Sequence, residues 1–312
     1  MQQLKPIQLN ERICLIDGHD LDMTERTGIF VILEEEITIV ETSASPSIKY
    51  VKEGLKDLGI SLDEVKYIIV THIHLDHAGG AGLLLKECPN AKVVVHPKGA
   101  RHLADPSRLI AGAKAVYGDK FAELFEPIVP IDNERLLIKN EGDKLRIGPN
   151  CQLEFLDTPG HAKHHFSIFD PVSNGMFTGD TVGVRYPQLV PDNVHLFLPS
   201  TSPNQFDPDA MHQAIDRMQN MELDSIYFGH YGTTNMPDEV YRQVSSWLEV
   251  YVNEAKTIYI EQQGYEVLAE RLLSLVREHL RGLGISDDHE VYSILQLDTE
   301  VSAMGLLDYL SK

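Results

Sequence analysis

The feature that most constrains this chain is a group of metal-ligand side chains directly after a short apolar run. Residues 67–70 read Tyr-Ile-Ile-Val, which predicts a strand buried between layers, and His72, His74, Asp76 and His77 follow at once. Side chains alternate along a strand, so we expect the first two histidines to share one face. If the chain then bends into a helix, the side chains of Asp76 and His77 can point to a second, adjacent metal position. Two neighbouring metals would then share this segment, and imidazole with carboxylate suits Zn²⁺, Fe and Mn²⁺.

Three later segments carry further ligand-type residues at the ends of predicted strands. His161 follows Thr-Pro-Gly, Asp180 follows Thr-Gly, and His230 follows Phe-Gly. Glycine permits a sharp turn or a close backbone approach, and strand ends hold their side chains rigidly. Because each metal needs three or four protein ligands, the sequence predicts that these residues complete the set.

In this order and spacing, the motifs H-x-H-x-D-H, G-H, G-D and G-H resemble those of the metallo-β-lactamase superfamily, over residues 28–232. The resemblance implies an α/β fold, a four-layer αβ/βα sandwich with the metals at one edge. It implies a ligand set divided between two metals: His72, His74 and His161 on the first, Asp76, His77 and His230 on the second, and Asp180 between them.

The sequence departs from the family pattern after an early strand. The usual Asp-Thr-Gly is replaced by Glu-Thr-Ser at residues 41–43. We expect the Glu41 carboxylate to support the site from behind the metal ligands. His74 disfavours the flavodiiron branch, in which Glu replaces the second histidine of the cluster.

The substrate branch is only partly indicated. The Asp-His pair and the Thr-Pro-Gly-His motif are similar to glyoxalase II and the quorum-quenching lactonases. Gly183, however, stands where such lactonases carry Tyr, and Ala162 stands where glyoxalase II enzymes carry Thr.

Four further residues are candidates for supporting or substrate-binding roles. His164 and His165 lie close to His161 in sequence, and because the ligand set is already complete we expect them to give hydrogen-bonding support. Arg185 and Tyr186 follow Asp180 closely and could polarise a substrate carbonyl, as oxyanion donors do.

We therefore expect a metal-dependent hydrolase with two divalent transition metals, Zn²⁺ first, with Fe or Mn as alternatives. A two-metal site makes hydroxide available near neutral pH, to attack a small ester, thioester, lactone or related substrate. Asp76 is the expected catalytic residue, because its carboxylate can accept a proton as well as bind metal. The alternatives are a phosphodiesterase, a mononuclear-iron sulfur dioxygenase, and a non-enzymatic metal-stabilised sensor or scaffold.

Composition restricts the partners and the compartment. A net charge of −20 over 312 residues disfavours nucleic acid and anionic membranes as partners, and for a hydrolase of this kind we expect a small-molecule substrate. Three cysteines without a CxxC pair indicate reduced thiols. Residues 1–6 lack the apolar core of a secretory signal, and no run of about 18 apolar residues is present, so we expect a cytoplasmic protein without a membrane span.

Hydrophobic periodicity divides the chain into a catalytic domain at 1–236 and an α-helical extension at 237–312. Strands are predicted at 12–17, 28–33, 37–41, 67–70, 91–95, 145–147, 151–156, 166–169, 176–178 and 225–228. Helices are predicted at 46–58, 79–87, 207–218, 237–263, 265–281 and 288–310, with irregular helix at 97–126 and a long loop at 181–205. The extension carries an apolar stripe that must pack on the catalytic domain or form a homodimer surface.

Overall fold

The computed structural model describes residues 5–312, which form two compact units. The first comprises the described chain up to Asp157 together with His164–Gly179 and Leu223–Asn235. The second comprises Thr158–Lys163, Asp180–Glu222 and Met236–Lys312. The prediction that no secretory signal is present rests partly on residues 1–4, which lie outside the described residues.

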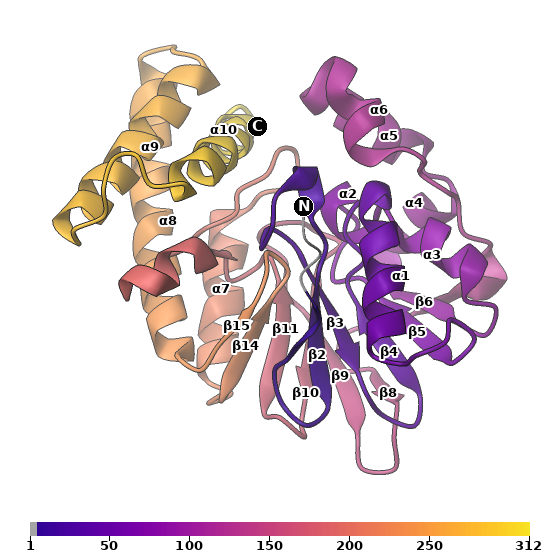
Figure 1. Cartoon of the computed structure of the whole chain (residues 1–312). Helices are drawn as coiled ribbons and strands as arrows, with labels where there is room; N and C mark the ends of the chain where they lie inside the picture. The colour runs from indigo at the N-terminus through magenta and orange to yellow at the C-terminus, as the bar shows by residue number, and fades with distance from the viewer. Residues whose placement is uncertain (1–4) are drawn as a thin grey trace. The chain divides into compact units, whose positions relative to one another are not determined.

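The first unit contains two large sheets (Figure 1). One has seven strands in chain order: β1 (Ile7–Gln8), β2 (Ile13–Asp17), β3 (Gly28–Ile32), β4 (Ile37–Val40), β5 (Val65–Ile69), β6 (Lys92–Val95) and β7 (Leu136–Ile138). The other has the order β15 (Thr233–Thr234), β14 (Ser225–Phe228), β11 (Gly175–Gly179), β10 (Phe166–Asp170), β9 (Gln152–Asp157) and β8 (Lys144–Arg146). The strands predicted at 28–33 and 37–41 form a hairpin, since β3 and β4 pair antiparallel, and β4 to β7 then run parallel.

Alternation along β3 shows how the sheets are covered. Phe30 and Ile32 belong to the core between the two sheets, whereas Ile29 and Val31 belong to the core on the opposite face. That opposite face is packed by helices α1 (Ile48–Asp57), α3 (Ala81–Glu87) and α4 (Pro97–Ala104). The first unit thus has a helical layer and two sheet layers. It also holds α2 (Leu75–Ala78), α5 (Ser107–Tyr117) and α6 (Phe121–Phe125).

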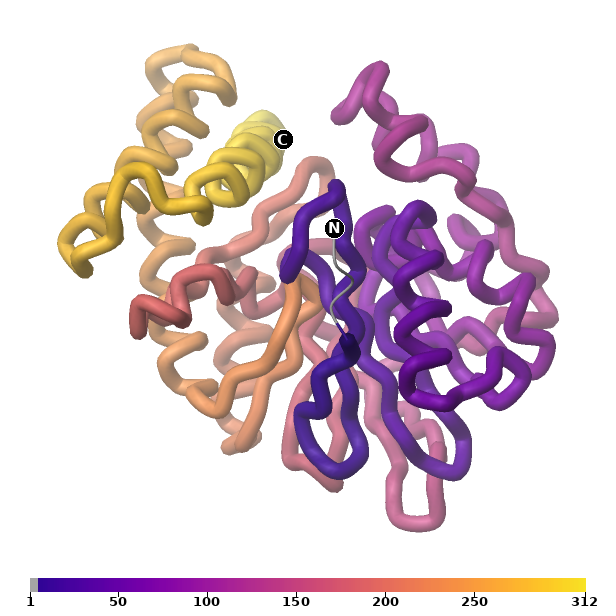
Figure 2. Tube along the Cα trace, in the orientation of Figure 1, coloured from indigo at the N-terminus to yellow at the C-terminus, as the bar shows by residue number. Residues whose placement is uncertain are grey.

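The second unit is mainly helical. It contains α7 (Pro208–Gln219), α8 (Pro237–Ile260), α9 (Tyr265–Gly282) and α10 (Val291–Leu310), and α10 packs against both α8 and α9 (Figure 2). Asp207 caps α7, because its carboxylate accepts a hydrogen bond from the N–H of Ala210 at 3.1 Å. The predicted apolar stripe is buried, with Leu268, Leu272 and Val276 each fully enclosed.

One local prediction is wrong in part. The segment at 181–205 is not a loop throughout, because β12 (Val184–Arg185) and β13 (Phe197–Leu198) pair antiparallel within it. Two-residue strands are defined by their pairing partner and leave no periodic pattern. The three long C-terminal helices are confirmed. The domain boundary at residues 236 and 237 stays a prediction.

Among residues 5–312, no helix is both long enough and apolar enough to cross a membrane.

Candidate metal centre

The predicted ligand cluster lies at the carboxyl end of β5. The strand ends at Ile69, so His72 and His74 stand in the connection after it rather than on the strand itself. The chain then bends into the short helix α2, as expected, and α2 carries Asp76 and His77. Nε2 of His72 lies 3.0 Å from Nδ1 of His74, so two imidazoles converge at this turn.

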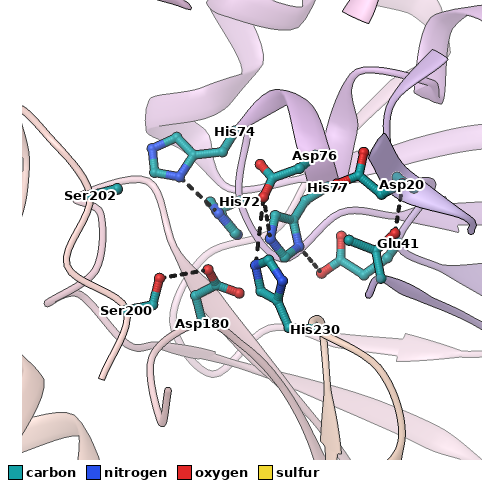
Figure 3. A network of polar contacts seen from close by, with 12 residues as sticks. Asp20, Glu41, His72, His74, Asp76, His77, Asp180, Ser200, Ser202 and His230 are labelled. Carbon is teal, nitrogen blue, oxygen red and sulfur yellow. Dashed lines mark hydrogen bonds and ion pairs between the residues drawn. The ribbon is translucent and has the colours of Figure 1, made fainter. Parts of the chain in front are cut away.

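Asp76, His77 and His230 form a compact group within the first unit (Figure 3). One carboxylate oxygen of Asp76 lies 3.6 Å from Nε2 of His77 and 3.6 Å from Nε2 of His230. His230 follows β14 through Gly229, where an added Cβ would stand 2.6 Å from the His77 ring. Only glycine permits this close approach, as the sequence predicted.

The separation of these three donors fits a metal ion. Tetrahedral coordination at about 2.1 Å places donor atoms about 3.4 Å apart, and the observed separations are 3.6 Å. Two imidazoles and one carboxylate are a donor set suited to zinc, iron or manganese. The side chains of His77 and His230 are 1% and 7% exposed, whereas that of Asp76 is 28% exposed, so the group reaches solvent at the carboxylate.

Glu41 stands directly behind the cluster at the end of β4. Its carboxylate accepts hydrogen bonds from the backbone N–H of Thr71, at 3.3 Å, and from the Thr71 hydroxyl. The same carboxylate oxygen lies 3.6 Å from Nδ1 of His77. Nδ1 of His72 lies 3.0 Å from the Thr71 hydroxyl oxygen. The Glu41 carboxylate therefore lies against His77 directly and reaches His72 through Thr71, and its supporting role stays a prediction.

Asp20 is a buried carboxylate beside this group that the sequence analysis did not identify. It is 3% exposed and lies 3.5 Å from the Arg26 guanidinium. Burial raises the pKa of Asp20 to about 6, and the nearby Asp76 carboxylate acts in the same direction. One signal was available: Asp20 follows the buried strand β2, and the other site residues also follow strands.

His164 and His165 follow the segment that contains His161, and both contact the ligand cluster after β5. Nδ1 of His164 accepts a hydrogen bond from the N–H of Ile73 at 3.5 Å. The His165 ring is fully buried and stacks on His72 with 5.0 Å between the ring centroids. Their supporting role stays a prediction.

The second unit brings His161 and Asp180 together. Nε2 of His161 lies 3.6 Å from a carboxylate oxygen of Asp180, and both side chains are buried. Ser200, which the sequence analysis did not select, accepts a hydrogen bond from Nδ1 of His161 through its carbonyl, at 3.0 Å. Its hydroxyl donates to Asp180 at 3.0 Å (Figure 3). The hydroxyl of Ser202 lies 3.4 Å from Nε2 of His161.

The two predicted substrate contacts lie near Asp180 in sequence. Arg185 is the last residue of β12, and Tyr186 follows it. The Tyr186 hydroxyl donates to the carboxylate of Asp298 in α10, at 2.9 Å. Their role in substrate binding stays a prediction.

Sandwiched sheets with histidine and carboxylate donors after the strand ends are typical of metal-dependent enzymes of the α/β class. The sequence model of the metallo-beta-lactamase superfamily matches residues 27–230, well over half of the 312-residue chain. The chain therefore belongs to the metallo-β-lactamase superfamily. The expected fold class is confirmed, and the protein is a metal-dependent hydrolase of that fold.

Several individual proteins are similar to this chain. The metallo-beta-lactamase fold-containing protein ST1585 of Sulfurisphaera tokodaii is 25% identical over 273 residues, which cover 86% of this chain and 94% of that protein. The N-acyl homoserine lactonase AiiA of Bacillus thuringiensis subsp. kurstaki is 28% identical, over 56% of this chain and 60% of the lactonase. The crystal structure of the metallo-beta-lactamase family protein TTHA1429 from Thermus thermophilus has a TM-score of 0.68 at 16% identity, covering 97% of this chain and 94% of that one. This structural match shows the shared fold.

Proposed function

We propose that this chain is a binuclear metal hydrolase that cleaves a small ester, thioester or lactone. The observation that carries the proposal is the group of Asp76, His77 and His230, whose donor atoms lie at metal-binding separations with Glu41 behind them. The similarity to an N-acyl homoserine lactonase supports a carbonyl substrate of this class.

The proposed ligand set adds His161 and Asp180 to the donors of the first unit. Chain connectivity supports Asp180, which is bonded to Gly179 at the end of β11. The Gly179 carbonyl accepts a hydrogen bond from the N–H of Gly229 at 3.4 Å, and Gly229 directly precedes His230. His161 stands in the connection between β9 and β10, two neighbouring strands of the same sheet.

The proposed assignment gives each residue one task. In this assignment His72, His74 and His161 would hold a first metal, Asp76, His77 and His230 would hold a second, and Asp180 would be a ligand shared by both. Zinc suits these donors best, with iron or manganese as alternatives. When bound, the metals supply Lewis acidity and make hydroxide available near neutral pH.

The protein's own residues would accept the proton of the attacking water and orient the ligand rings and the substrate. The partly exposed Asp76 carboxylate can accept the proton of the attacking water, because it reaches solvent while the neighbouring histidines are buried. Glu41 and His165 keep the ligand rings in place. Arg185 and Tyr186 are the proposed contacts to the substrate carbonyl, with the Tyr186 hydroxyl held by Asp298.

We further propose a cytoplasmic protein without nucleic-acid partners, because the net charge is −20 and the three buried cysteines are unpaired. The helices at 237–312 are proposed to pack as an extension of the catalytic domain at 1–236 or to form a homodimer surface.

The test is turnover on a substrate panel with the metal content known. Purified protein is assayed with lactones, thioesters, simple esters and phosphodiesters, while oxygen uptake is followed with a thiol substrate. Hydrolysis of one of the carbonyl classes, abolished by a chelator and restored by Zn²⁺ or Mn²⁺, supports the proposal. Activity on phosphodiesters alone, or oxygen uptake with one iron per chain, would overturn it in favour of the corresponding alternative.

A further inference from the structure

Within the second unit, the segment at 199–205 contacts His161 and Asp180 through one residue and helix α10 through the next. Ser200 faces His161 and Asp180, as described above. Thr201, the next residue, faces α10 instead, and its hydroxyl donates to the carbonyl of Ser302 at 2.9 Å. The neighbouring residues Ser200 and Thr201 therefore connect two ligand-type side chains with the C-terminal helix.

Ser200 contacts its two neighbours through different atoms. Its carbonyl can only accept, so the proton of the His161 ring must reside on Nδ1, and Nε2 is left as the lone-pair donor. Its hydroxyl donates to one carboxylate oxygen of Asp180. A single residue thus sets the tautomer of a histidine and the orientation of a carboxylate, which is the task of an outer residue at a metal site.

Helix α10 supports this stretch at three points on one face. Ser302 accepts the hydrogen bond from Thr201, and the Asp308 carboxylate accepts one from the N–H of Asn204 at 3.1 Å. Gly305 lies between them, where an added Cβ would stand 2.0 Å from the Thr201 carbonyl oxygen. Spacings of three residues place these positions on the same side of a helix. The backbone of the segment therefore rests directly on α10, and glycine is required at the contact.

We propose that Ser200 is a positioning residue for His161 and Asp180, and that α10 is the element that holds Ser200 in place. This gives the C-terminal helices a role in assembling the metal centre. The inference rests on the proposed function, because it takes His161 and Asp180 to be metal ligands.

The first test removes the hydroxyl of Ser200. Ser200→Ala keeps the carbonyl that fixes His161 and deletes the donor to Asp180, so zinc affinity, measured by competition with a chelator, should fall by about tenfold to a hundredfold. The visible spectrum of the Co²⁺-loaded protein should change as well. Ser200→Thr retains a hydroxyl and should restore both values. Ser293→Ala, whose hydroxyl bonds to Glu290 within the same turn, is the matched control and should behave as wild type.

The second test acts on the backbone from α10. Gly305→Ala places a methyl group against the Thr201 carbonyl, so the segment must move, and zinc affinity should fall at least as far as in Ser200→Ala. Gly282→Ala, at the end of α9, meets no atom within 4 Å and is the control for the same chemical change. Circular dichroism of the metal-free proteins checks folding, and if Gly305→Ala does not fold, Ser200→Ala decides.

The outcomes separate this inference from the proposed function. A wild-type protein that binds no zinc or cobalt would contradict the proposed function itself. If the wild type binds metal and both Ser200→Ala and a folded Gly305→Ala match it in affinity and Co²⁺ spectrum, only the positioning role is overturned.

Discussion

The carboxylate of Glu41 lies 3.6 Å from Nδ1 of His77, and through Thr71 it also reaches His72. One buried carboxylate therefore contacts His77 directly and His72 through Thr71, which are proposed ligands of different metals. Buried carboxylates of this kind fix the ring orientation of a histidine and raise its basicity.

Glu41→Gln should weaken binding of both metals, because a neutral amide holds the two imidazoles less strongly. The expected loss of zinc affinity is about tenfold to a hundredfold, measured by chelator competition. Glu64→Gln is the control, since Glu64 is exposed and its carboxylate accepts hydrogen bonds from nearby Ser61. Wild-type affinity in Glu41→Gln would show that Glu41 has no supporting role.

Asp76→Asn separates metal binding from proton transfer. The amide keeps the shape and one neutral oxygen ligand but cannot accept a proton from water. The variant should keep the first metal, lose part of the second, and lose roughly two orders of magnitude or more in turnover. Turnover numbers and metal content are measured on the same sample. Near-normal turnover in this variant would remove Asp76 from the catalytic role.

The three thiols should be unreactive in the folded protein. Cys14, Cys88 and Cys151 are at most 3% exposed, and burial raises the pKa of Cys88 to about 11 and that of Cys151 to about 12. A raised thiol pKa leaves almost no thiolate near pH 8, and the thiolate is the nucleophile. Ellman's reagent at pH 8 should therefore label the cysteines only after unfolding in denaturant. Rapid labelling of the native protein would contradict this burial.

Removal of residues 237–312 should give an insoluble or inactive protein. Helix α8 packs against α7 and β13, and its residues Val240, Val244 and Leu248 are fully buried. Truncation after Met236 would expose the apolar surfaces that these side chains cover. Solubility and turnover of the shortened chain are the measurements. A soluble truncated protein with full activity would show that the extension has no structural or catalytic role.

Local patterns predicted much of the fold. The strand at 225–228 was predicted with its observed bounds, because an apolar run ends there at a glycine. The helix predicted at 207–218 is observed as α7, and the carboxylate of Asp207 caps its start. Gly229 was predicted to permit a close approach, and it lies against the His77 ring.

Residues whose position depends on distant segments were not predicted. Ser200 contacts His161 and Asp180 across 39 and 20 residues, and serine in a proline-rich stretch carries no pattern of its own. Asp20 lies near Asp76 only because β2 and β5 belong to the same sheet. A single sequence contains the residue types of such contacts but not the pairing that creates them.

Metal quantification on wild-type and Asp180→Ala protein tests whether the chain holds two metals with Asp180 as a shared ligand. Wild-type protein loaded with Zn²⁺ and freed of excess metal should contain two ions per chain. Asp180→Ala removes the proposed bridge, so its occupancy should fall below two under the same conditions. Two tightly bound metals in Asp180→Ala would show that Asp180 is not the shared ligand, and no more than one metal in the wild type would show that the site is not binuclear.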